Sequence, residues 1–294
     1  MAIVSPRIDG IRDSEIQAGS LRMHVVEAGP ADGDPVLLLH GWPQHWYQWR
    51  HQIPALAEAG YRVIVPDLRG FGQSEAPPEG YEKENMATDV LNLMDAMGLE
   101  RVKLLAHDWG GFIAFILCVR APERFEKYVA LNISHLWAKS DPRTLLNIWR
   151  LWYMAVIGGP FGAWLLQNRP GFVRRMIQGS PPNPAWTEED LDAYIRPLQE
   201  PARANASVQL YRTFLTKEFG PLAGGRYHEK RLTVPTRLLF GTDDFAIPKS
   251  LFRRDPKEFA DDFTIEFIPD TGHFIGEERP ELVNDRTLEF FATA

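Results

Sequence analysis

The chain has 294 residues, of which 45% are hydrophobic and 24% are charged, and its formal net charge is -7. These proportions are typical of a globular protein, and the negative charge excludes the basic footprint of a nucleic-acid-binding protein. The single cysteine, Cys118, excludes an intramolecular disulfide and favours a reducing compartment. Residues 1–10 lack an apolar signal segment, and no apolar run is long enough to span a bilayer, so we expect a cytoplasmic protein without a membrane partner.

The first part of the chain alternates between candidate strands and candidate helices. Alternating or continuous apolar residues predict strands at 21–27, 36–39, 62–65, 102–105 and 128–131. Helical spacing of apolar residues predicts one helix from Trp46 to about Gly60 and another over residues 86–97. This alternation predicts an α/β fold with a mostly parallel sheet and helices on both faces.

The alternation stops after His135. Residues 136–229 hold no clear strand, but they contain tryptophan-rich helical stretches such as 145–155. Strands resume at 236–240 and 264–268, and a last helix is predicted over 280–291. We therefore predict a core formed by residues 1–135 and 230–294 and a helical cap domain formed by residues 136–229.

One candidate strand ends at an acid flanked by small residues, in the segment Leu104-Leu105-Ala106-His107-Asp108-Trp109-Gly110-Gly111. A strand that turns directly into a helix, with one reactive side chain at the corner, forms a nucleophile elbow, and small neighbours let strand and helix approach closely. An aspartate at this corner can attack carbon without a base and form an ester that water later breaks. Asp is also a favoured N-cap residue, so this segment alone leaves both interpretations of Asp108 open.

Two later strands are also followed directly by polar residues. Asp243 and Asp244 follow the strand at 236–240, and His273 follows the strand at 264–268. Open α/β sheets place their ligands at the carboxyl ends of the strands, so these side chains are expected near Asp108. The order of nucleophile, acid and histidine is that of the α/β-hydrolases.

From about Leu21 to Phe291 the chain resembles the epoxide hydrolase family of α/β-hydrolases. His40-Gly41-Trp42-Pro43 is similar to the His-Gly-x-Pro loop of that family, and Ala106 to Gly111 is similar to its elbow. The resemblance implies an α/β-hydrolase fold with an inserted helical cap. It also implies that an apolar epoxide and water give a vicinal diol without a cofactor or a metal.

The resemblance assigns roles to individual residues. Asp108 would be the nucleophile and His273 the general base, and Asp244, three residues after Gly241, matches the supporting acid better than Asp243. The cap tyrosines Tyr153 and Tyr211 would donate protons to the epoxide oxygen, although helical periodicity alone makes each an ordinary core residue.

The remaining assignments concern the oxyanion hole and the substrate pocket. The backbone N–H groups of Trp42 and Trp109 would form the oxyanion hole. Substrate contacts are expected from His40, Trp109 and Trp149, although the cap aromatic residues could equally form the core of the cap.

Three other interpretations remain. A haloalkane or haloacetate dehalogenase would use the same Asp108, but Trp42 replaces the usual Asn of the first group and Trp109 the usual Arg of the second. A non-catalytic ligand-binding hydrolase fold would not need the nucleophile, acid and histidine. A metal site at His40, His107, Asp108 and His273 lacks a short ligand pair. The sequence leaves open whether the protein is a monomer or a homodimer.

Overall fold

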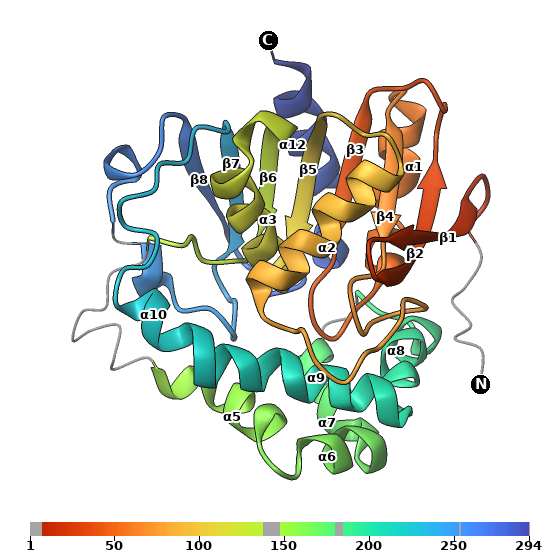
Figure 1. The fold of residues 1–294 in the computed structure, drawn as a ribbon, viewed down its shortest axis with the longest axis vertical. Helices are drawn as coiled ribbons and strands as arrows, with labels where there is room; N and C mark the ends of the chain where they lie inside the picture. Colours follow the sequence, from red (N-terminus) through yellow and green to blue (C-terminus); the bar gives the residue numbers. More distant parts are fainter. Residues whose placement is uncertain (1–7, 138–147, 180–184, 253, 294) are drawn as a thin grey trace.

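A computed structural model describes residues 8–137, 148–179, 185–252 and 254–293. Its centre is an eight-stranded sheet with the order β1-β2-β4-β3-β5-β6-β7-β8 (Figure 1). The strands are β1 (Arg12–Ala18), β2 (Leu21–Ala28), β3 (Pro35–Leu39), β4 (Arg62–Pro66), β5 (Val102–His107), β6 (Phe125–Leu131), β7 (Thr236–Gly241) and β8 (Phe263–Ile268). β1 and β2 pair antiparallel with each other, as do β2 and β4, and all other pairs are parallel.

The predicted strands are confirmed, whereas β1 was not predicted from the sequence. Six of the seven β1 residues are exposed or half-buried, so this edge strand carries no apolar alternation that would reveal it. By contrast, every residue of β5 is buried, because a central parallel strand is covered on both faces. The mostly parallel sheet with helices on both faces is therefore confirmed, with an antiparallel addition at one edge.

Helices cover both faces of the sheet. α1 (Gln52–Glu58) packs against α12 (Pro280–Ala292), and α2 (Lys83–Ala96) packs against α3 (Asp108–Arg120) on the opposite face (Figure 1). The helix predicted from Trp46 is divided, because a 3-10 helix, η1 (Trp46–Trp49), precedes α1. The core lies between these helices and the sheet.

The segments between β6 and β7 form a helical layer across the carboxyl ends of the parallel strands (Figure 1). No strand occurs within 148–179 or 185–229, the described parts of the predicted cap. The helices are η3 (Ile148–Leu151), α5 (Trp152–Gly158), α6 (Gly162–Asn168), α7 (Pro170–Gln178), α8 (Glu188–Ile195), η4 (Pro197–Gln199), α9 (Pro201–Thr213), the π-helix η5 (Phe214–Glu218) and α10 (Phe219–Ala223). Across the described residues, every helix is too short or too polar to span a membrane.

Candidate active site

Asp108 lies at a sharp corner between β5 and α3, where its φ angle is +49°. The residue in the N-cap position of α3 is His107, and the Asp108 carboxylate instead accepts a hydrogen bond of 2.9 Å from the backbone N–H of Trp42. A Cβ atom added to Gly110 would lie 2.4 Å from the carbonyl oxygens of both Leu39 and His40. The small residue at 110 is therefore required for the close contact between α3 and the end of β3.

The loop after β3 approaches the Asp108 side chain from the other side. A Cβ atom at Gly41 would lie 2.5 Å from Asp108 Oδ2, so only glycine lets the loop come this close. The Trp42 indole N–H donates to Ser207 Oγ on α9 at 3.1 Å, which holds the loop to the helical layer above. Burial raises the pKa of the Asp108 carboxyl, whereas His273 and the backbone N–H groups of Trp109 and Trp42 oppose this shift.

His273 follows β8 and contacts two carboxylates. Its Nδ1 lies 2.9 Å from Asp244 Oδ2, and its Nε2 lies 3.8 Å from Asp108 Oδ1. The charges of Asp244 and Asp108 outweigh burial and raise the pKa of His273 to about 9. His273 is therefore a cation at neutral pH while both carboxylates are ionised.

Asp244, and not its neighbour Asp243, is the carboxylate at His273. Asp244 is buried, and its Oδ1 accepts hydrogen bonds from the backbone N–H groups of Ala246 and Ile247 at 2.7 and 2.9 Å. Asp243 is exposed, and its Oδ1 accepts from the Thr242 hydroxyl. Burial alone would raise the pKa of Asp244, but the charge of His273 and the hydrogen bonds from His273, Asn132 and Ile247 lower it.

Tyr153 on α5 and Tyr211 on α9 lie side by side above Asp108. Both side chains are buried, and their rings meet edge to face with centroids 5.8 Å apart. Tyr211 also packs edge to face on Trp42 at 5.5 Å and on Trp109 at 5.6 Å. Burial raises the pKa of both phenols well above the ordinary value, and the Asp108 charge raises both further. Both tyrosines therefore keep their protons at neutral pH.

A cavity of about 780 Å³ reaches this site from the side of η3 and α7. Tyr153 and His273 line it together with the aromatic side chains of Trp152, Phe172 and Phe245. The Phe245 ring packs on both Tyr153 and His273, so the wall beside these two groups is aromatic, whereas charged side chains such as Arg175 and Glu278 line the cavity elsewhere.

The other predicted contacts occupy different positions. His40 is buried beneath the loop, where its Nε2 accepts from the Leu68 backbone N–H at 2.9 Å and its Nδ1 lies 3.1 Å from the Gly41 carbonyl oxygen. With both ring nitrogens engaged by backbone, His40 supports the loop and offers no free nitrogen to a substrate. The Trp109 ring packs on Phe214 at 4.9 Å beside the site. The side chain of Trp149 lies outside the described residues.

Two residues contact the Asp244–His273 pair in a way that the sequence did not predict, although His107 was named there as a possible metal ligand. Asn132 directly follows β6 and has a positive φ angle of 40°, and its Nδ2 donates to Asp244 Oδ2 at 2.7 Å. Its position just after a strand is the same signal that identified the other candidates. His107 precedes the elbow, and its Nε2 lies 2.9 Å from the His273 carbonyl oxygen. Burial and the nearby His273 lower the pKa of His107 to about 3, so it is neutral.

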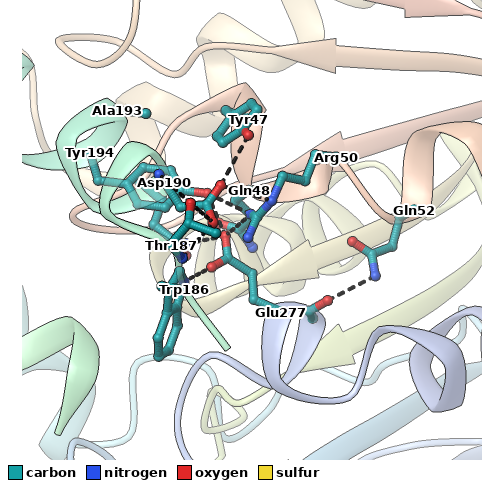
Figure 2. A network of polar contacts seen from close by, with 12 residues as sticks. Tyr47, Gln48, Arg50, Gln52, Trp186, Thr187, Asp190, Ala193, Tyr194 and Glu277 are labelled. Carbon is teal, nitrogen blue, oxygen red and sulfur yellow. Dashed lines mark hydrogen bonds and ion pairs between the residues drawn. The ribbon is translucent and has the colours of Figure 1, made fainter. Parts of the chain in front are cut away.

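A third missed feature is a buried carboxylate four positions after His273. Glu277 on α11 (Ile275–Glu278) accepts hydrogen bonds from four donors, a set that we call the Glu277 network; the donors are Gln44, Arg50, Trp186 and Tyr194. Figure 2 shows its carboxylate facing Arg50 from the core and Trp186 and Tyr194 from the helical layer. No sequence motif marks these residues, because they come from three distant segments.

The chain is similar to known proteins over nearly its whole length. A family model described as alpha/beta hydrolase fold matches residues 34–154. A soluble epoxide hydrolase from Corynebacterium sp. (strain C12) is 34% identical over 290 residues, which cover 92% of this chain and 94% of that protein. Epoxide hydrolase A from Mycobacterium tuberculosis is 29% identical, with 94% of this chain and 95% of that protein covered. A ligand-free structure of the epoxide hydrolase CorEH matches with a TM-score of 0.84 at 32% identity, covering 96% of this chain and 99% of that one.

Proposed function

Because the chain belongs to the epoxide hydrolase family of α/β-hydrolases, we propose that it converts an apolar epoxide and water to a vicinal diol through an ester on Asp108. The observation that carries this proposal is the meeting of a carboxylate nucleophile with two protonated phenols. Asp108 lies at the elbow below Tyr153 and Tyr211, and its charge raises the pKa of both tyrosines.

In the first step, an Asp108 oxygen attacks a ring carbon and the bond from that carbon to the epoxide oxygen breaks. Trp42 holds Oδ2, so Oδ1 is the oxygen available for attack. A tyrosine hydroxyl gives its proton to the epoxide oxygen as the bond breaks, which prevents a free alkoxide from forming. The apolar cavity wall of Trp152, Phe172 and Phe245 favours an apolar substituent on the epoxide.

In the second step, His273 removes a proton from water, and the water oxygen attacks the carbonyl carbon of the ester. Alkylation neutralises Asp108, which removes one of the charges that raise the pKa of His273. The imidazolium then releases its proton, which replaces the proton that the tyrosine gave to the epoxide, and neutral His273 can act as the base. The negative charge of the tetrahedral intermediate falls on Oδ2, where Trp42 N–H already donates and Trp109 N–H is adjacent. The intermediate collapses as the bond from the carbonyl carbon to the alkyl oxygen breaks, and His273 returns the proton to the departing diol oxygen. The new Asp108 carboxyl group then gives its proton to His273, which restores the starting carboxylate and imidazolium.

The cap division and the location belong to the same proposal. The tyrosines come from helices between β6 and β7, which supports a core of residues 1–135 and 230–294 with a cap of residues 136–229. The only cysteine, Cys118, is buried and free, which supports a cytoplasmic site of action.

A single turnover of styrene oxide in heavy-oxygen water tests the covalent route. With enzyme in excess, we expect the label in the Asp108 carboxylate and none in the diol, because water attacks the ester carbonyl and the alkyl oxygen leaves with the product. Mass spectrometry of the peptide that contains Asp108 and of the diol provides the measurement.

Label found directly in the first-turnover diol would contradict the ester. Chloride or fluoride released from haloalkanes or fluoroacetate, without diol formation from styrene oxide, would identify a dehalogenase instead. A halide ion leaves without an acid, so that outcome would also leave the tyrosines without a role.

A further inference from the structure

Lys83 is a fully buried lysine that takes no part in the two steps above. It is the first residue of α2, and its side chain is 0% exposed. Its Nζ forms an ion pair of 2.9 Å with Glu218 Oε2, and its backbone N–H donates to Glu218 Oε1 at 2.8 Å. Lysine is rarely buried completely. The other contacts of Lys83 therefore indicate a role for the buried ammonium group.

The ammonium group of Lys83 contacts the turn of helix that carries Tyr211. Nζ donates to the Leu210 carbonyl oxygen at 2.6 Å and to Thr213 Oγ1 at 3.3 Å. The regular helix ends at this point: the Phe214 N–H bonds to the Tyr211 carbonyl, and the π-helix η5 begins. In a regular α-helix the Leu210 carbonyl would accept a hydrogen bond from the Phe214 N–H. Because that N–H bonds to Tyr211 here, the ammonium group of Lys83 supplies a donor to the Leu210 carbonyl.

The same ammonium group lies over the ring of Trp109. Nζ is 4.7 Å from the centre of this ring, close enough for a cation–π contact, and the Trp109 ring in turn packs edge to face on Tyr211. Lys83 thus contacts both the backbone beside Tyr211 and the indole against which its phenol rests. In Figure 1 the end of α2 where the helix begins faces the cap helices, as these contacts require.

We propose that Lys83 is a positioning residue that holds the Tyr211 hydroxyl in place for the opening of the epoxide. The inference rests on the proposed function, in which Tyr211 contacts the epoxide oxygen. A displacement of a reacting group by about 1 Å can reduce the rate of a catalysed step by roughly 100-fold.

The contacts also limit which step depends on Lys83. Within the described residues, its hydrogen bonds go to Tyr81, Leu210, Thr213 and Glu218, and none joins it to His273 or Asp244. Its contact with Trp109 is to the indole ring, whereas the backbone N–H of Trp109 that serves the second step is held by the start of α3. Ring opening should therefore depend on Lys83, whereas hydrolysis of the ester should not. Burial lowers the pKa of Lys83 to about 8, and Glu218 opposes the shift, so the ammonium form predominates at neutral pH.

The test separates the two steps in the Lys83→Met variant, which keeps an unbranched stem as far as Cε and removes the ammonium group. With styrene oxide as probe, rapid quenching and intact-protein mass spectrometry follow the appearance and the loss of the ester on Asp108. We expect ester formation to slow by roughly 10- to 100-fold and ester hydrolysis to stay within about twofold. In a Tyr211→Phe background, Lys83→Met should cause no further loss, because its effect passes through Tyr211.

A matched control is Lys103→Met. Lys103 is also buried and paired, with Asp34 and Glu126, but it lies near the amino end of β5, away from Asp108. This variant should leave both rates unchanged. If Lys83→Met does not fold, the double variant Lys83→Met, Glu218→Gln removes the unpaired carboxylate and allows the same measurements.

Three results would overturn the positioning role. They are unchanged ester formation in Lys83→Met, an equal slowing of ester hydrolysis, and a full additional loss in the Tyr211→Phe background. In each case the wild type still forms the ester and the diol, so the proposed function stands. A wild type that forms neither ester nor diol from any epoxide tested would overturn both.

Discussion

The hydrogen bonds around Asp244 distinguish it from Asp243, the aspartate next to it in the chain. Ala246, Ile247 and Asn132 donate to its two carboxylate oxygens and fix its orientation toward Nδ1 of His273. Because Nδ1 then carries the proton, Nε2 is the nitrogen that can accept a proton from water. The orientation of the proposed base therefore depends on one carboxylate and three donors.

Substitution of the two aspartates separately tests this dependence. We expect Asp244→Asn to slow ester hydrolysis by roughly 1,000-fold or more while ester formation continues, because an amide cannot hold the imidazole in the required tautomer. The ester should then accumulate on Asp108 and be visible by intact-protein mass spectrometry. Asp243→Asn is the matched control, because the Asp243 side chain is exposed and its carboxylate accepts from the Thr242 hydroxyl, whereas His273 bonds to Asp244. Equal effects of the two variants would contradict the assignment.

The residues of this site differ in how well they could be predicted. Asp108, Asp244 and His273 each follow a strand directly, so a local pattern and the rule for parallel sheets place them together. Lys83 and Glu218 are 135 positions apart in the chain, and no local pattern connects them. Their pairing is a property of how the helices between β6 and β7 pack on α2.

At the scale of elements, the contact between α3 and the end of β3 positions the elbow. The site depends on this contact because β3 leads to the loop of Trp42 and α3 begins at Asp108. The Trp42 N–H reaches the Asp108 carboxylate only when these two elements lie close together. The strands that build this frame could be predicted because buried parallel strands are continuously apolar. β1 could not, because an exposed edge strand needs no apolar residues to pair.

Gly110→Ala tests the closeness of this contact. The new methyl group would meet two backbone carbonyl oxygens, which cannot move away as a flexible side chain can. We expect the free energy of unfolding to fall by about 2 kcal/mol or more, measured by urea denaturation, together with a loss of ester formation. Gly171→Ala is the control, since Gly171 in α7 has open space around its Cβ position and should gain about 0.5 kcal/mol. A Gly110→Ala variant as stable as the wild type would show that the contact can relax.

At the scale of the whole molecule, the Glu277 network joins the core to the helical layer. Arg50 donates to Glu277 at 2.7 Å from the core, and Trp186 and Tyr194 donate from the helical layer. Arg50 also lies 3.4 Å from Asp190 on α8, and Tyr47 donates to the same carboxylate at 3.0 Å (Figure 2). Because Glu277 lies four residues after His273, this network ties the position of α8 to the loop of the proposed base.

Tyr194→Phe removes one donor of the Glu277 network and leaves the ring in place. Burial raises the pKa of Glu277 to about 7, whereas the Tyr194 hydrogen bond opposes this shift by stabilising the carboxylate. At a pH above the pKa of Glu277 the carboxylate is ionised, and this hydrogen bond stabilises the folded state. As the pH falls below that pKa, Glu277 is protonated and the contribution of the bond to stability decreases. We expect Tyr194→Phe to lower the free energy of unfolding by about 2 kcal/mol near pH 8 and by less near pH 6, with faster hydrogen exchange in α8. Tyr61→Phe, which removes a hydroxyl far from Glu277, should show neither change. An equal loss at both pH values would mean that the hydroxyl does not act through the carboxylate.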